Sequence, residues 1–390
     1  MCYYLLPHIS KKLIPSEVEI KLSEDYQNHI SKTSFIYLSK LKKEIENHMN
    51  KWDNYKKFTN TYEYIHTQVP GCNFSVSRYK PLSRSYFKLI EIINIFGLLD
   101  NIKYTKIQTF HLCEGPGGFI EAMVTMRNNP EDKYYGISLI NNDENTPGWK
   151  KSIKFLKNNK NVTIEYGKDN TGNILNKENF NYCVNKYGNS CHIITGDGGF
   201  DFSVNFNNQE NICNKLILYQ IMYAIMLQKS KGTFILKIFD MFTKSTDDYI
   251  YLLSLFYNKV YIIKPQTSRL ANSEKYIVCK EFKTFTKSNM FGYLHLFNRI
   301  IDETEYCNNN TFITSFLKQK IPYFYISKLE EISNVLCQFQ LNIINNTIQL
   351  IKYNKTDSKE KIDEMVNNNI SKCMQWCTKN NINYNKFNVN

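Results

Sequence analysis

Short apolar runs alternate with longer amphipathic stretches through the middle of the chain, from about residue 80 to about residue 285. Short apolar runs are typical of buried strands, and apolar residues three or four positions apart are typical of helices packed on them. The predicted strands are residues 107–113, 134–139, 162–166, 192–195, 233–239, 260–264 and 275–280. The predicted helices are residues 83–98, 119–126, 149–158, 207–229 and 247–257.

This alternation favours an α/β fold in which a mostly parallel, seven-stranded sheet is covered by helices on both faces. The last two predicted strands are joined by a segment that is too short to contain a helix. A parallel connection would need a longer crossover, so we expect these two strands to form a terminal antiparallel hairpin. Ligands of such sheets bind beyond the carboxyl ends of the parallel strands.

A glycine-rich turn, Glu114-Gly115-Pro116-Gly117-Gly118, follows the first of these strands and precedes a predicted helix that begins at Phe119. A turn with so little side-chain bulk lets a ligand approach the backbone closely. A dinucleotide site would need Gly-x-Gly-x-x-Gly and an acidic residue after the next strand, where this chain has Ser138-Leu139. A P-loop is excluded because no Gly-Lys-Ser/Thr follows the turn.

Four charged residues lie at predicted strand ends or near a helix start: Lys88, Asp197, Lys237 and Glu274. Taken singly, Lys88 is a helix-surface lysine and Glu274 is a charge at the base of a hairpin. Asp197 lies between glycines that leave its carboxylate open to a ligand. Lys237 interrupts an apolar strand, and lysine is seldom buried unless it is paired. The set as a whole therefore predicts a polar site at the sheet edge.

In this order, the motifs resemble those of FtsJ-type ribose 2′-O-methyltransferases, most closely the cap-specific mRNA enzymes of eukaryotes and viruses. The resemblance covers about residues 80–285 and rests on residues 83–89, 112–119, 136–139, 196–200, 234–243 and 264–279. It implies a Rossmann-like S-adenosylmethionine-dependent methyltransferase fold and methylation of a ribose 2′-hydroxyl near the 5′ cap of mRNA. Ribosomal or transfer RNA ribose methylation, or a non-catalytic RNA-binding module that keeps the fold, are the alternatives.

The resemblance implies a catalytic Lys-Asp-Lys-Glu tetrad. Lys237 would activate the 2′-hydroxyl, Asp197 would orient that lysine and face the sulfonium methyl, and Lys88 and Glu274 would complete the polar frame. S-adenosylmethionine is the implied cofactor, and its expected contacts are Glu114, Gly115, Pro116, Gly117, Gly118, Phe119, Ser138, Asn173 and Asp197. The family commonly has Asp where this chain has Asn173, which can accept a hydrogen bond from the adenine amino group but lacks the charge.

A ribose hydroxyl is a poor nucleophile that must lose its proton as it attacks, and a lysine accepts this proton only if its pKa falls toward neutrality. Lys88 and the sulfonium lower the pKa of Lys237, whereas Asp197 and Glu274 raise it. The sequence leaves open which effect is larger, and in-line positioning could supply much of the rate. The chemistry requires no metal, and we expect none.

The formal net charge of +13 and a pI of about 9.0 indicate a polyanionic partner, although Lys- and Asn-rich usage can also reflect an AT-rich genome. The expected partner is capped mRNA, with other capping or transcription proteins as further candidates. The cations that flank the motifs and are predicted to contact RNA are Arg78, Arg84, Lys264 and Arg269. Stacked aromatic rings would hold a methylated cap, but 28 Tyr and 25 Phe offer too many candidates.

The longest apolar segment, residues 216–227, is too short to span a membrane, and the 11 cysteines show no disulfide framework. We therefore expect a soluble intracellular protein, cytoplasmic or packaged in the virion if the chain is viral and nuclear otherwise. The sequence does not indicate an oligomeric state.

The predicted domains are a helical N-terminal extension (1–75), a methyltransferase domain (76–288) and a mostly helical C-terminal extension (289–390). The first extension either covers the core or, through its Lys- and aromatic-rich residues 52–64, forms part of an RNA groove. In the last, residues 316–320 and 329–350 are predicted helices. The chain after residue 352 is polar, and we expect partial disorder at its end.

Overall fold

The computed structural model describes residues 3–25, 27–140, 148–199, 208–305, 311–352 and 358–388. Phe200 and Asn207, which belong to a predicted motif and a predicted helix, lie outside these residues. The centre is an eight-stranded sheet in the order β1-β8-β9-β7-β6-β3-β4-β5. Its strands are β1 (Tyr3–Leu5), β3 (Gln108–Leu112), β4 (Lys133–Ile137), β5 (Val162–Glu165), β6 (Cys191–Gly196), β7 (Gln228–Ile238), β8 (Tyr257–Ile263) and β9 (Lys275–Phe282).

The strands β7, β6, β3, β4 and β5 are parallel to one another, while β9 is antiparallel to both β7 and β8. The mostly parallel α/β sheet and its antiparallel hairpin are therefore confirmed, and all seven predicted strands are present. The eighth strand, β1, pairs antiparallel with β8 at the edge of the sheet. With three residues it is too short to show an alternating pattern in the sequence.

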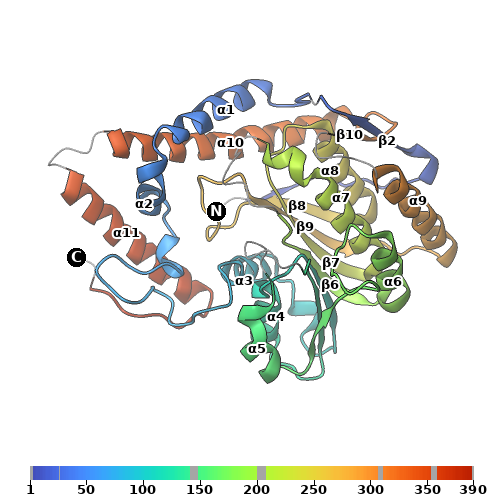
Figure 1. Ribbon diagram of the computed structural model, residues 1–390, viewed down its shortest axis with the longest axis horizontal. Helices are drawn as coiled ribbons and strands as arrows, with labels where there is room; N and C mark the ends of the chain where they lie inside the picture. Colours follow the sequence, from blue (N-terminus) through green and yellow to red (C-terminus); the bar gives the residue numbers. More distant parts are fainter. Residues whose placement is uncertain are drawn as a thin grey trace.

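Helices cover both faces of the sheet (Figure 1). One face carries α3 (Ser85–Phe96), α4 (Gly118–Arg127) and α5 (Ile153–Asn158). The other carries α6 (Lys177–Tyr187), α7 (Gln209–Leu227), α8 (Lys244–Phe256) and α9 (Lys287–Glu305).

Side chains along β7 alternate between the two cores, with Phe234 and Leu236 toward α7 and Ile235 toward α3. By the same alternation, Lys237 points to the face that carries α3. The register of the strand thus brings a lysine amine toward the helix that bears Lys88.

The flanks add the helices α1 (Lys32–Glu46), α2 (Met49–Thr59), α10 (Tyr323–Lys352) and α11 (Ser358–Lys379), and a two-stranded sheet of β2 (Val18–Ser23) and β10 (Phe312–Leu317). α1 and α10 lie side by side and share an apolar core that includes Leu38, Ile45 and Ile348 (Figure 1). We call α1, together with the residues 28–31 that lead into it, α2 and α10 the arm.

One C-terminal prediction needs correction. The predicted helix at residues 316–320 is wrong, because Phe316 and Leu317 end strand β10. The described residues after 352 include helix α11, and partial disorder at the end of the chain stays a prediction. The apolar side of α11 is buried against α3, where Trp376 meets Phe87 with ring centroids 5.9 Å apart. The predicted helix at residues 329–350 is confirmed as part of α10.

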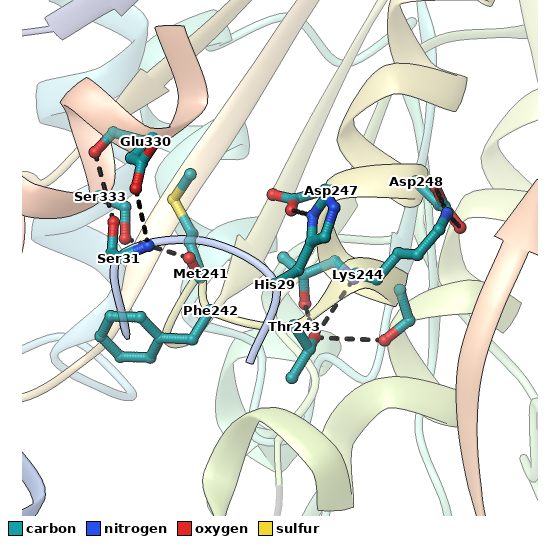
Figure 2. A network of polar contacts seen from close by, with 12 residues as sticks. His29, Ser31, Met241, Phe242, Thr243, Lys244, Asp247, Asp248, Glu330 and Ser333 are labelled. Carbon is teal, nitrogen blue, oxygen red and sulfur yellow. Dashed lines mark hydrogen bonds and ion pairs between the residues drawn. The ribbon is translucent and has the colours of Figure 1, made fainter. Parts of the chain in front are cut away.

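A polar network fastens the arm to the loop that connects β7 to α8, residues 239–243 (Figure 2). The amide of His29 donates to the carbonyl oxygen of Phe242 at 2.6 Å, and the hydroxyl of Ser333 donates to the carbonyl oxygen of Met241 at 3.0 Å. The imidazole Nδ1 of His29 lies 2.7 Å from the buried carboxylate of Asp247 on α8. The arm is therefore attached to the loop that directly follows β7, the strand that carries Lys237.

Candidate active site

The carboxyl ends of β3, β4, β6 and β7 form one edge of the sheet, and β9 begins at this edge because it runs antiparallel to β7. A cavity of about 890 Å³ opens there. Nine of the predicted site residues line it: Arg84, Glu114, Gly115, Pro116, Ser138, Asn173, Asp197, Lys237 and Glu274. The fold thus brings residues from distant parts of the sequence around a single cavity.

The glycine-rich turn is held in shape by its own glutamate. The carboxylate oxygen Oε1 of Glu114 accepts hydrogen bonds from the amides of Phe119 (2.6 Å) and Ile120 (3.1 Å) in the first turn of α4. Burial and the nearby charge of Asp197 raise the pKa of Glu114 well above its ordinary value. Gly117 has a φ of 106°, which only glycine adopts without strain.

Space around the turn is also limited. A Cβ on Gly118 would collide with the hydroxyls of Ser83 and Ser85, which lie just before and within the start of α3. The absence of a side chain at residue 118 therefore lets α4 pack against the segment that leads to Lys88.

Part of the cavity lies where β4 ends. Ser138 and Asn173 line it, and a Cβ on Gly172 would collide with the carbonyl oxygen of Ser138. The side-chain oxygen of Asn173 accepts a hydrogen bond from the amide of Leu175 at 3.0 Å, which fixes the orientation of the side chain. Ligand pockets place a few polar groups at fixed positions, and these two side chains can serve in this way.

Lys237 and Asp197 form an ion pair, with 3.3 Å between Nζ and Oδ1, and the same Nζ donates to the carbonyl oxygen of Asp197 at 2.6 Å. Burial opposes the charge on Lys237, but the carboxylates of Asp197 and Glu274 outweigh it, so the pKa of Lys237 is raised. Gly199 leaves room beside the amine, since a Cβ there would lie 3.4 Å from Nζ.

Lys88 and Glu274 form the second pair, with Nζ 2.8 Å from each carboxylate oxygen. The hydroxyl of Ser268 also donates to Glu274, at 2.7 Å. Burial alone would raise the pKa of Glu274, but Lys88 and Lys237 lower it to about 2. Glu274 is therefore ionised over the whole physiological range of pH.

Tyr276 connects the two pairs and was not predicted from the sequence. Its hydroxyl donates to Asp197 Oδ1 at 2.8 Å, and the amine of Lys88 lies 5.9 Å from the centre of its ring. The available signal was spacing, since residues two apart on a strand point to the same face and Tyr276 follows Glu274 by two. Gln220 was also missed: this buried residue of α7 accepts a hydrogen bond from the amide of Gly198 at 3.2 Å.

The cations predicted to contact RNA differ in their surroundings. Arg78 is exposed. Lys264 is half-buried and donates to the carbonyl oxygens of Asn272 (2.6 Å) and Glu274 (2.7 Å), and desolvation lowers its pKa to about 7. Arg84 and Arg269 both bind the carboxylate of Glu63. Contact of these cations with RNA stays a prediction, and three of them have partners within the protein.

The opposite wall of the cavity comes from the arm. α1 and α2 contribute Lys42, Ile45, Met49, Trp52, Asp53 and Lys56, and α10 contributes Gln340. Gln340 donates to the carbonyl oxygen of Ala271 at 2.9 Å, so α10 also contacts the loop before Glu274. The cavity is therefore walled by both the sheet edge and the flanks.

Among the described helices, none combines the length and the apolar character needed to cross a bilayer. The described cysteines are all unpaired, and Cys373 and Cys377 are buried on the packed side of α11.

Residues 81–282 match the family model described as FtsJ-like methyltransferase. The chain is 30% identical over 273 residues to the cap-specific mRNA (nucleoside-2′-O-)-methyltransferase of Autographa californica nuclear polyhedrosis virus, covering 69% of this chain and 86% of that protein. It is 30% identical over 270 residues to cap-specific mRNA (nucleoside-2′-O-)-methyltransferase 1 of Dictyostelium discoideum, covering 64% of this chain but 35% of that protein. A relative in Caenorhabditis briggsae, 29% identical over 204 residues (51% of this chain and 24% of that protein), is named as an inactive enzyme of the same type.

Proposed function

Because the chain belongs to the FtsJ-like methyltransferase family, we propose that it methylates the ribose 2′-hydroxyl near the 5′ cap of mRNA with S-adenosylmethionine as the methyl donor. The observation that carries the proposal is the two partly buried ion pairs, Lys237–Asp197 and Lys88–Glu274, of which Asp197, Lys237 and Glu274 line one cavity. The chain spans only about a third of the Dictyostelium relative, so its activity requires a direct test.

The lining of the cavity fits S-adenosylmethionine. The turn at residues 114–118 presents backbone without side-chain bulk and would hold the methionine end, next to the negative charge of Asp197. Ser138 and Asn173 would hold the adenosine end through hydrogen bonds. When bound, the cofactor supplies an electrophilic methyl group.

Lys237 is the residue that we propose to contact the 2′-hydroxyl. Its raised pKa means that the amine is protonated before RNA binds, so it first orients the hydroxyl oxygen by donating a hydrogen bond. An ammonium has no lone pair, so Lys237 can accept the hydroxyl proton only after its own proton has passed to Asp197 or to water. Lys88 and Glu274 complete the frame by fixing the charges around this amine.

We further propose that residues 76–288 form the catalytic unit and that the extensions on either side form the far wall of the RNA site. This is supported by the lining that α1, α2 and α10 contribute to the cavity. Capped mRNA is the proposed partner, and Arg78 is the exposed cation near the motifs that we expect to contact its phosphates.

The proposal is tested with two RNAs of identical sequence, one capped and one with a 5′ triphosphate. Labelled methyl transferred from S-adenosylmethionine is mapped by nuclease digestion. The expected result is strong labelling of the capped RNA at the ribose of the first or second transcribed nucleotide. Equal labelling of both RNAs, or labelling only of structured ribosomal or transfer RNA, would favour the other ribose methyltransferases. RNA binding without any transfer would favour a non-catalytic module.

A further inference from the structure

Glu63 is a buried carboxylate from the N-terminal extension, outside the segment that matches the family model. It lies in a short 3₁₀ helix, Glu63–Ile65, and only 1% of the residue is exposed. Two guanidinium groups bind it: Arg84 Nη1 donates to Oε2 at 2.9 Å, while Arg269 donates through Nη2 to Oε1 (2.8 Å) and through Nε to Oε2 (3.1 Å). We call Glu63, Arg84 and Arg269 the Glu63 clamp.

The two arginines belong to the two segments that present Lys88 and Glu274. Arg84 is the N-cap residue of α3, one turn before Lys88. Arg269 lies in the loop of residues 264–274, which ends at Glu274 just before β9. The carboxylate of Glu63 therefore joins the segment that carries Lys88 to the loop that carries Glu274.

A second set of contacts joins the same two segments. On α3, Glu91 accepts hydrogen bonds from the amides of Gln266 (2.7 Å) and Thr267 (3.1 Å). Arg84 Nε donates to the carbonyl oxygen of Thr267 at 3.0 Å. The loop is thus fixed to α3 directly at residues 266 and 267 and, through Glu63 and Arg84, at residue 269. The Glu63 clamp supplies the ion pairs of this attachment.

We propose that Glu63 is a positioning residue that sets the Lys88–Glu274 geometry through Arg84 and Arg269, and that these arginines serve this purpose rather than phosphate binding. The effect on catalysis rests on the proposed function, but the attachment of the loop does not. Bidentate arginine–carboxylate bonds fix orientation as well as distance. A lysine in place of the arginine, or a neutral amide in place of the carboxylate, would not reproduce them.

The first test is Glu63→Gln, which keeps the volume but removes the charge between two guanidinium groups. The expected result is a kcat lowered by about tenfold or more, with the KM for S-adenosylmethionine changed less than about twofold, because displacement of a reacting group by less than 1 Å is costly. Hydrogen exchange of the full chain should become faster at the amides of residues 266–274 and 84–88.

The matched control is Asp132→Asn. Asp132 is also buried and binds an arginine, with Arg127 Nε 2.8 Å away, but it lies before β4 at the opposite edge of the sheet. We expect a comparable loss of thermal stability, kcat within about twofold of the wild type and unchanged exchange at residues 266–274. If Glu63→Gln lowers kcat no more than Asp132→Asn and leaves exchange of the loop unchanged, the proposal is wrong.

Arg269→Lys provides a second test, which can be carried out even if Glu63→Gln does not fold. A lysine keeps the positive charge but cannot bind Glu63 through two nitrogens, so kcat should fall with little change in the KM for RNA. An increased KM for RNA with unchanged kcat would instead identify Arg269 as a phosphate contact and overturn the proposal. If the wild-type chain transfers no methyl group to capped RNA, the proposed function fails, and the exchange measurements still decide whether Glu63 fixes the loop.

Discussion

The four charged side chains of the two ion pairs are mostly buried, and each has a partner of opposite sign within 3.3 Å. Removing one member of such a pair leaves an uncompensated buried charge, which costs more than the pair contributes. Substitutions here therefore need a binding measurement and a matched control beside each activity assay.

Lys237→Ala is expected to lower methyl transfer by about a hundredfold or more, because the 2′-hydroxyl loses the group proposed to orient it. Affinity for S-adenosylmethionine, measured by calorimetry, should change less than about threefold, since the proposed cofactor contacts lie in the turn at residues 114–118 and at Asn173. Lys280→Ala is the control, because Lys280 is also a strand lysine that donates to a backbone carbonyl, that of Phe96 at 2.7 Å. Retention of most activity by Lys237→Ala would remove this lysine from the mechanism.

Gly117→Val is expected to weaken binding of S-adenosylmethionine by more than about tenfold, because a side chain forced into a φ of 106° distorts the turn. Gly71→Val is the control: Gly71 also has a positive φ of 77°, but a Cβ there would meet no atom within 4 Å. Both variants should lose stability through backbone strain, and only the first should lose affinity in calorimetry. Equal affinities in both folded variants would place the cofactor elsewhere.

At the scale of elements, the sequence predicted the central strands because each is a short apolar run flanked by turns. It did not predict α6, whose sequence is polar apart from a few apolar residues such as Phe180 and Cys183. The signal was its N-cap, since the side-chain oxygen of Asn176 accepts from the amides of Glu178 and Asn179. α9 and β2 were also missed, because their stability comes from packing on other parts of the chain.

The same contrast holds for the site. Motif order and spacing predicted nine of the residues that line the cavity, since most of these follow the carboxyl ends of neighbouring strands. The sequence left open whether residues 52–64 cover the core or form part of an RNA groove, because the contacts that place them join residues about 200 positions apart, such as Glu63 and Arg269. Nothing in local pattern or propensity reports such a contact.

Attachment of the arm through His29 and Asp247 should make stability depend on pH. Burial raises the pKa of Asp247 to about 7, and the hydrogen bond to Asp247 raises the pKa of His29. Between about pH 4 and pH 7 the folded chain therefore holds a proton that the unfolded chain has released, so the free energy of unfolding falls as pH rises. Because the pKa of His29 is also raised, its titration lowers the free energy of unfolding further at higher pH.

Asp247→Asn removes this titration. As pH rises from about 4 to about 7, the free energy of unfolding should fall less in the variant than in the wild type. The difference between the two falls should be about 1 kcal/mol or more. Urea unfolding at several pH values measures the difference. Asp302→Asn, which alters an exposed ion pair with Lys177, is the control and should follow the wild type. Parallel pH profiles for the wild type and Asp247→Asn would exclude a role of this carboxylate in the pH dependence.

At the scale of the whole molecule, the excess of 13 positive charges and the cavity walled by the arm favour a bound polyanion. The affinity for RNA should fall steeply with salt, because lysines and arginines that contact phosphates release counterions. With four or five such contacts, a plot of log K against log salt should have a slope of about −3. Fluorescence anisotropy over a range of salt concentrations measures it, and an affinity independent of salt would argue for a protein partner instead.

The edge strand β1 has a consequence for how the chain is made. Tyr3–Leu5 are synthesised about 250 residues before their partner β8, so the sheet can be completed only late. Until then the backbone amides and carbonyls of β1 lack their partners, and the outer side of β8 stays open to any other extended segment. Two nascent chains on one messenger could exchange this strand, which would yield a swapped dimer rather than two monomers. A bulky fusion placed directly before Tyr3 would hinder the late pairing of β1 with β8.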